Sequence, residues 1–246
     1  PLATRLATAV MMRVINHGVD WQTFAPGTSS EREADRTMVV YDSAGGQRTI
    51  GSLRPYLLSV GSIRWRKGYK RSLKAFALVH EQFPQLSYVI VGRRSTEKYF
   101  SQLRDIIRAL KLDDAVVFLD TVDDTATLGA LYRNAELFCR LSQDWGYDVE
   151  GVGLVFLEAA AAGLAVVGSS RSGVEDAVQA GKNGLLVDRV DEQEFARAIM
   201  RILGDRLLRE KMGRASLAWA QASSWEYRIS EYAALYQNLN PSVASS

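Results

Sequence analysis

Two glutamates and a glycine turn stand together in residues 148–167, DVEGVGLVFLEAAAAGLAVV. Glu150 and Glu158 are eight positions apart, a little over two helical turns, so both carboxylates can face the same side. Between them, Gly151 and Gly153 let backbone approach a ligand at a helix N-terminus, where free N–H groups favour an anion such as phosphate. The carboxylates can accept hydrogen bonds from sugar or ribose hydroxyls. For Glu158, a helix carboxylate paired with a base is the alternative.

A basic cluster follows the first regular apolar run of the chain, YLLSVGSI (residues 56–63). Arg64, Arg66 and Lys67 stand within four positions, where an anion can be bound. Arginine holds phosphate through two N–H groups and lysine acts as a point charge. A solvated basic turn is the alternative, but the position at the carboxyl end of a strand favours phosphate binding.

The sequence lacks the residue patterns of several other chemistries. The first strand is not followed by G-x-G-x-x-G, and there is no G-x-x-x-x-G-K-[ST] loop. Neither glutamate stands near a pair of histidines or cysteines, so we expect no metal site and no cofactor. There is no G-x-S-x-G element and no credible Ser-His-Asp set. Cys139 lies in an apolar run and is expected to be a buried thiol, while Ser169, Ser170 and Ser172 suit helix capping better than anion binding.

Short apolar runs alternate with amphipathic stretches over most of the chain. We expect strands at residues 56–63, 86–92, 115–119, 136–141, 164–167 and 184–188. We expect helices at residues 69–83, 99–110, 123–134, 154–162, 173–180, 195–203, 206–222 and 225–239. This alternation predicts an α/β fold, a Rossmann-like doubly wound parallel sheet of about six strands with helices on both faces. Ligands bind such sheets at the carboxyl ends of the strands, where both candidate anion sites fall.

Composition limits the possible partners. The chain has 246 residues, of which 47% are hydrophobic, which suits one sizeable domain with extensions. The net charge of +2 is too balanced to indicate a nucleic-acid partner. The sequence contains no run of about 18 apolar residues, so it predicts no transmembrane helix. The first residues include neither an initiator methionine nor a clear signal peptide, so we expect the sequence to come from the middle of a longer protein.

Four segments follow from this pattern. Residues 1–27 are expected to be an interdomain connector and residues 28–54 a polar insert. Within the insert, Thr28–Arg36 is expected to be mobile, and residues 38–41 and 48–50 flank a glycine turn that can form a hairpin. The Rossmann-like domain is placed at residues 55–222, and residues 223–246 are expected to form a final helix and tail.

Four motifs resemble, in order, the nucleotide-sugar-binding C-terminal half of GT-B glycosyltransferases, in particular the retaining group 4 family. INHGVDWQTFAP resembles I-P-N-G-V-D-x-x-x-F-x-P, and VGSIRWRKG resembles V-G-R-L-x-x-x-K-G. EGVGLVFLEAAAAGLAVV resembles E-G-F-G-x-x-x-x-E-A-x-A-x-G-x-P-V-V, and SGVEDAVQAGKNGLLVD resembles G-G-x-P-E-x-[IV]-x-x-G-x-x-G-x-L-V. The resemblance covers Ile15 to about Leu239 and implies one half of a GT-B fold.

The resemblance implies roles for the charged residues. Lys67 would contact the donor diphosphate. The family arginine that accompanies it is Ser62 here, so Arg64 or Arg66 would supply the missing charge. Glu150 would bind donor-sugar hydroxyls, which makes Lys67 and Glu150 the implied catalytic residues. Glu158 would hold the ribose hydroxyls.

Backbone groups complete the implied donor site. The N–H groups that face sugar and phosphate would belong to Gly151, Val152 and Gly153. Leu154 and Val155 would begin the helix under the phosphates. Gly92 would lie close to the nucleotide, and Val122 would meet the base through its backbone.

The resemblance implies the donor-binding half of a retaining hexosyltransferase that uses a GDP- or UDP-linked sugar. Basic side chains and a helix N-terminus would neutralise the leaving diphosphate without a metal. A glycan or lipid-linked acceptor would be bound by an N-terminal domain missing from this chain, which alone would be inactive. The protein would be cytoplasmic, peripheral at the membrane in its full-length form. A non-catalytic nucleotide- or sugar-binding module and a GT-B-type sugar-nucleotide epimerase are the alternatives.

Overall fold

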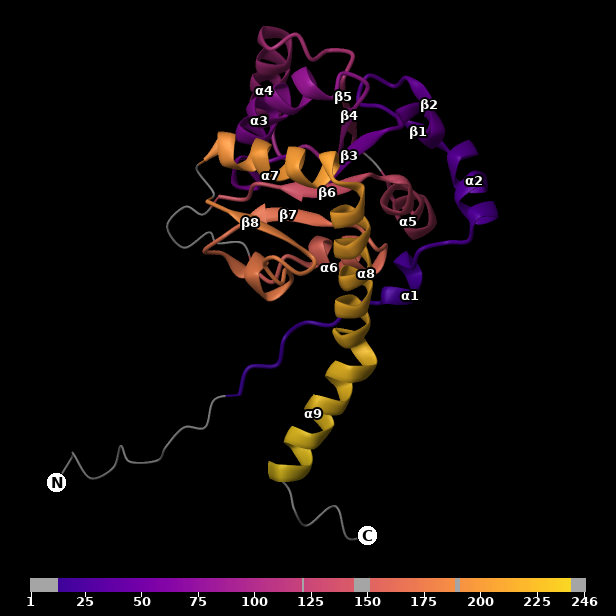
Figure 1. The fold of residues 1–246 in the computed structure, drawn as a ribbon, viewed down its shortest axis with the longest axis vertical. Helices are drawn as coiled ribbons and strands as arrows, with labels where there is room; N and C mark the ends of the chain where they lie inside the picture. Colours follow the sequence, from indigo (N-terminus) through magenta and orange to yellow (C-terminus); the bar gives the residue numbers. More distant parts are fainter. Residues whose placement is uncertain (1–12, 121, 144–150, 189–190, 240–246) are drawn as a thin grey trace, which may run out of the picture.

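The computed structural model describes residues 13–120, 122–143, 151–188 and 191–239 (Figure 1). Its centre is a parallel six-stranded sheet with the order β5-β4-β3-β6-β7-β8. The strands are β3 (Tyr56–Val60), β4 (Ser87–Val91), β5 (Val116–Leu119), β6 (Leu137–Arg140), β7 (Val166–Ser169) and β8 (Gly184–Val187). The chain runs outward from β3 to β5, returns to place β6 beside β3, and then runs outward again. The strand order therefore reverses between β3 and β6, which confirms the predicted doubly wound fold.

Helices cover both faces of this sheet, because the strands are apolar on both sides. The helices α3 (Tyr69–Gln82), α4 (Glu97–Ala109) and α7 (Glu192–Gly204) pack on one face, and α5 (Thr125–Asn134) and α6 (Leu154–Ala161) on the other. Successive strand residues alternate between the two cores: Leu57 belongs to the first and Leu58 to the second. The helix α8 (Arg206–Ala222) contributes Met212 to the first core and Ala220 to the second.

Three expected elements differ in the structure. The first strand was expected to reach Ile63, but β3 ends at Val60 because Gly61 has φ +148°, outside the range of a regular strand. The strand after α6 begins at Val166 rather than Leu164, because Gly163 with φ +74° ends the helix and two residues are needed to turn into the sheet. A 3₁₀ turn, η4 (Gly173–Asp176), replaces the short helix expected at residues 173–180.

The segment expected to be mobile at Thr28–Arg36 is instead the helix α2 (Ser29–Thr37). The sequence signal for this helix is a capping box: the Glu31 N–H donates to Thr28 Oγ1 at 3.2 Å, and the Thr28 N–H donates to Glu31 Oε2 at 2.7 Å. The expectation of mobility was wrong because a capping box stabilises a helix even in a polar segment.

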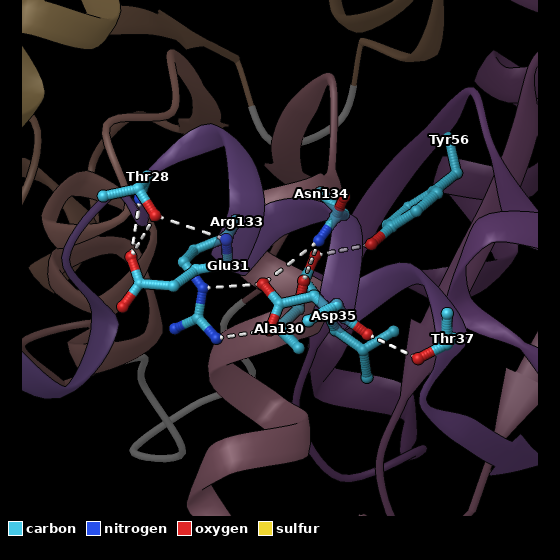
Figure 2. A network of polar contacts seen from close by, with 10 residues as sticks. Thr28, Glu31, Asp35, Thr37, Tyr56, Ala130, Arg133 and Asn134 are labelled. Atoms are coloured by element: carbon cyan, nitrogen blue, oxygen red, sulfur yellow. Dashed lines mark hydrogen bonds and ion pairs between the residues drawn. The ribbon is translucent and has the colours of Figure 1, made fainter.

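One buried carboxylate anchors α2 to α5 (Figure 2). Asp35, 7% exposed, accepts from Arg133 Nε at 2.8 Å and from Arg133 Nη2 at 2.9 Å. Asn134 Nδ2 also donates to it, at 3.3 Å. Three hydrogen-bond donors compensate the burial of this carboxylate, and because they belong to α5 they hold α2 on the domain.

The insert continues as a hairpin that was predicted from its glycine turn. The strands β1 (Val39–Tyr41) and β2 (Gln47–Thr49) pair antiparallel and lead into the 3₁₀ turn η2 (Ile50–Leu53). Val40, Ile50 and Leu53 are buried in the core that also contains residues of the central sheet. The insert therefore shares its apolar contacts with the sheet.

Two further helices lie outside the sheet layers. A short helix, α1 (Trp21–Phe24), packs near α5 and α6, and α9 (Trp225–Leu239) extends away from the body of the domain (Figure 1). Its aromatic side chains at Trp225, Tyr232 and Tyr236 are 39%, 43% and 66% exposed. Within the ranges that the structure describes, no helix combines the length and apolar character needed to span a membrane.

Candidate functional site

The basic loop after β3 is held against β6 by backbone contacts. It forms the 3₁₀ turn η3 (Trp65–Lys67), which ends at Gly68 in the left-handed conformation with φ +70°. A Cβ on Gly68 would overlap the carbonyl oxygen of Leu141, the residue after β6, so only glycine permits this approach. The Gln143 N–H donates to Arg66 O at 2.9 Å and fixes the loop from the other side. These contacts bury Lys67 to 8% exposure.

A second buried cation, Arg140, ends β6 on the other side of the strand-order reversal. It is 1% exposed, the largest fully buried side chain among the described residues. Its Nε donates to Ser142 Oγ at 3.1 Å and its Nη1 donates to Val60 O at 3.0 Å. The guanidinium carbon also lies 5.2 Å from the centre of the Phe156 ring, a cation–π distance.

The helix α6 begins beside these cations. Its N-cap, Gly153, has φ +66°, and the Phe156 N–H donates to Gly153 O at 2.8 Å as the first helical bond. The N–H groups that precede Phe156 in the first turn have no intrahelical acceptor, and this end of the helix carries the positive end of its dipole. This N-terminus therefore adds partial positive charge.

These elements enclose a cavity of about 340 Å³ at the carboxyl ends of β3 and β6. It is lined by Gly61, Ser62, Arg64, Lys67, Arg140, Val152, Gly153, Leu154 and Val155. Among these described lining residues three are cationic and no side chain is acidic. The volume suits part of a nucleotide-sized ligand, and the charge favours an anion. The structure thus brings Ser62, Lys67 and residues 152–155 together around one cavity.

Glu158 lies one turn further along α6 and does not line this cavity. Its Oε2 accepts a 2.7 Å hydrogen bond from the buried hydroxyl of Tyr132 on α5. Burial raises the pKa of Glu158 above its ordinary value of 4.5, although the Tyr132 hydrogen bond and the Arg140 charge act in the opposite direction. The alternative of a carboxylate paired with a base is not what the structure shows, because the hydrogen-bond partner is a tyrosine.

The raised pKa of Glu158 predicts a pH-dependent difference in stability. The folded state holds this proton more tightly than the unfolded state, so stability falls as pH rises from 4.5 through the folded-state pKa. Glu158→Gln removes this dependence. We expect the free energy of unfolding of Glu158→Gln, relative to the wild type, to increase from pH 4.5 to neutrality in urea titrations. Glu81→Gln, on an exposed part of α3, is the control, and a relative stability independent of pH would contradict the prediction.

Besides Glu158, four predicted site residues in the described part of the chain lie outside the cavity lining: Arg66, Gly92, Val122 and Gly151. Gly92 has φ +152°, and a Cβ at this position would overlap Gly61 O. A glycine is therefore needed here because the ends of two strands approach each other closely. Val122 is half-buried against the second core. Arg66 is buried and does not line the cavity, whereas Arg64 does. Glu150 lies outside the described residues, and Gly151, the first residue after that gap, is exposed.

A larger cavity of about 510 Å³ lies at the opposite edge of the sheet. Its residues include Arg54 and Glu136, which precede β3 and β6, so it faces the amino ends of the strands. Its charges are largely compensated: Arg54 and Arg209 both pair with Glu136, at 2.9 Å and 3.1 Å. We therefore place the candidate site at the carboxyl edge, where cations converge in a cavity without an acidic lining side chain among the described residues.

The cavity and its sheet fall within a region shared with known proteins. The family model described as glycosyl transferases group 1 matches residues 46–219. The chain belongs to this family. The GT-B resemblance drawn from the sequence motifs is thereby confirmed.

Individual members of the family show the extent of the similarity. The D-inositol 3-phosphate glycosyltransferase of Kribbella flavida is 30% identical over 247 residues, which cover 97% of this chain and 54% of that protein. A GDP-mannose-dependent alpha-(1-6)-phosphatidylinositol monomannoside mannosyltransferase of Mycobacterium tuberculosis is 29% identical over 228 residues, which cover 92% of this chain and 55% of that protein. The chain therefore spans about half the length of these curated relatives.

A solved member of the same architecture supports the fold. Anabaena HepE, crystallised with UDP, superposes with a TM-score of 0.78 at 21% identity, covering 92% of this chain and 57% of HepE. At this identity the likeness shows the fold alone.

Two residues of this glycosyltransferase-family site were not predicted from the sequence, Arg140 and Tyr132. A signal was present for Arg140, because a charged residue in the buried run LFCRL needs a special environment. Tyr132 gave no such signal, since a tyrosine on an amphipathic helix is an ordinary core residue. In the described part of the chain, no three His, Cys, Asp or Glu side chains are grouped so that they could hold a metal ion.

Proposed function

We propose that this chain is the donor-binding half of a retaining glycosyltransferase that transfers a hexose, of mannose or glucose type, from a GDP- or UDP-linked donor to an acceptor hydroxyl. The observation that carries the proposal is the cavity at the strand-order reversal, where Arg64, Lys67 and Arg140 meet the N-terminus of α6. Open α/β sheets bind their ligands at this point.

The charge of the cavity fits the chemistry of glycosyl transfer. When the bond between the sugar and the diphosphate breaks, negative charge grows on the leaving diphosphate. Positive groups already fixed around that position stabilise the transition state more than the ground state. Lys67 is fixed in this way, since its loop is held by Gly68 and Gln143.

The remaining roles complete the proposed donor complex. Glu150 would bind hydroxyls of the donor sugar, and Glu158 would bind the ribose with its carboxylate oriented by Tyr132. Backbone N–H groups of residues 151–153 would face sugar and phosphate. Gly92 and Val122 would lie on the nucleotide side, beyond the described cavity lining.

The acceptor is assigned to residues outside this chain, because the relatives are about twice as long as the matched region. One relative's name gives GDP-mannose as donor and a phosphatidylinositol mannoside as acceptor. A glycan or lipid-linked acceptor is proposed here on that similarity. A lipid-linked acceptor would bring the full-length enzyme to a membrane surface.

A binding panel tests the proposal. The 246-residue chain is heated with GDP, UDP, GDP-mannose, UDP-glucose, guanosine and uridine, each at a concentration of about 1 mM. Because a ligand that binds the native state raises Tm, we expect GDP or UDP and the matching sugar nucleotide to raise Tm more than the nucleoside does. No shift with any nucleotide would contradict the proposal. Binding without glycosyl transfer by the full-length protein would instead identify a non-catalytic module.

A further inference from the structure

Arg140 is positioned by its surroundings to face the cavity from the sheet side. A buried arginine is costly unless its N–H groups are bonded. Ser142 and the carbonyl of Val60 fix the plane of the guanidinium, and the Phe156 ring lies against it. The side chain therefore has little freedom where it lines the cavity.

Arg140 and Lys67 converge on one backbone position. A Cβ built on Gly61 would lie 3.1 Å from Arg140 Nη1 and 3.7 Å from Lys67 Cε. The Tyr69 hydroxyl donates to Gly61 O at 2.8 Å and holds this position. A phosphoryl group that enters the cavity beside Gly61 would therefore meet both basic side chains.

We infer that Arg140 binds a phosphoryl group of the donor diphosphate, and that with Lys67 it makes the site selective for two linked phosphoryl groups. This inference rests on the proposed function and adds Arg140, from β6, to the residues that bind the donor diphosphate. Ser62 faces the same cavity with a neutral side chain, so the positive charge of this wall comes from elsewhere. A guanidinium can bind one phosphate through two N–H groups while the ammonium of Lys67 contacts the other as a point charge.

Calorimetric titration of the 246-residue chain with guanosine, GMP and GDP, and with uridine, UMP and UDP, tests this role. For the base that the wild type binds, Arg140→Met is expected to weaken diphosphate binding about tenfold and nucleoside binding less than about twofold. Arg140→Lys, which keeps the charge but not the fork, is expected to fall between the wild type and Arg140→Met. Unchanged diphosphate affinity in Arg140→Met, or an equal loss for nucleoside and diphosphate, would overturn the assignment.

Ser142→Ala keeps the test decisive if Arg140→Met does not unfold cooperatively. This milder variant loosens the guanidinium, and we expect a smaller loss that is again confined to the phosphorylated ligands. No loss, or a loss shared with the nucleoside, would count against Arg140. A wild-type chain that binds none of the six ligands would refute the proposed function itself. A wild type that prefers the diphosphate while Arg140→Met and Ser142→Ala keep that preference would refute only the role of Arg140.

Discussion

Gly68→Ala is expected to lower the free energy of unfolding by more than about 4 kcal/mol and to abolish nucleotide binding. The reason is steric: the new Cβ would overlap the Leu141 carbonyl oxygen, which is backbone and cannot move without shifting the end of β6. The left-handed conformation at φ +70° adds strain for any residue with a Cβ. Since Lys67 immediately precedes Gly68, displacement of the loop removes a cation from the cavity. Urea unfolding and calorimetry with GDP and UDP measure the two effects.

Gly181→Ala is the matched control for this substitution. Gly181 has a similar left-handed conformation, with φ +77°, but no heavy atom lies within 4 Å of an added Cβ. It should therefore cost only the conformational strain, about 1–2 kcal/mol, and leave nucleotide binding intact. Equal costs for Gly68→Ala and Gly181→Ala would show that the loop after β3 does not pack against β6.

The sheet could be predicted from the sequence because each strand is a short apolar run that must be buried on both faces. Right-handed connections between such strands leave few arrangements. The apolar pattern predicts a strand that reaches Ile63, whereas β3 ends at Val60 because Gly61 departs from the strand conformation. Hydrophobic periodicity reports burial, and Ile63 is indeed buried. It does not report the backbone angles.

Contacts between distant segments explain what the sequence did not predict. The carboxylate of Asp35 accepts hydrogen bonds from Arg133, which is 98 positions away in the chain. The local sequence of Thr28–Arg36 therefore cannot indicate that this helix is held on the domain. The position of Arg140 also depends on distant segments, because β6 lies beside β3 only after the chain has passed through β4 and β5. Glycine spacing in residues 151–153 was informative because a helix N-terminus is a local structure.

Lys67→Met is expected to weaken the binding of GDP or UDP about 30-fold while changing nucleoside affinity less than about twofold. Lys67 is only 8% exposed, so water and salt screen its attraction to a diphosphate less than they screen that of a surface lysine. Methionine fills a similar volume without charge, which limits the damage to packing. Calorimetry with each nucleoside and its diphosphate separates the contribution of the phosphates from that of the base and ribose.

Lys74→Met is the control for the change in net charge. Lys74 is also close to this domain's basic loop in sequence, but it lies on α3 with its side chain 53% exposed and pairs with Glu192 at 3.6 Å. Its removal lowers the net charge by the same amount and should leave diphosphate affinity within about twofold, because an exposed charge is screened by water and salt. Similar losses in Lys67→Met and Lys74→Met would mean that the overall field of the domain attracts the nucleotide. A loss confined to Lys67→Met would instead require a local contact, which is the arrangement that the convergence of η3, β6 and α6 predicts.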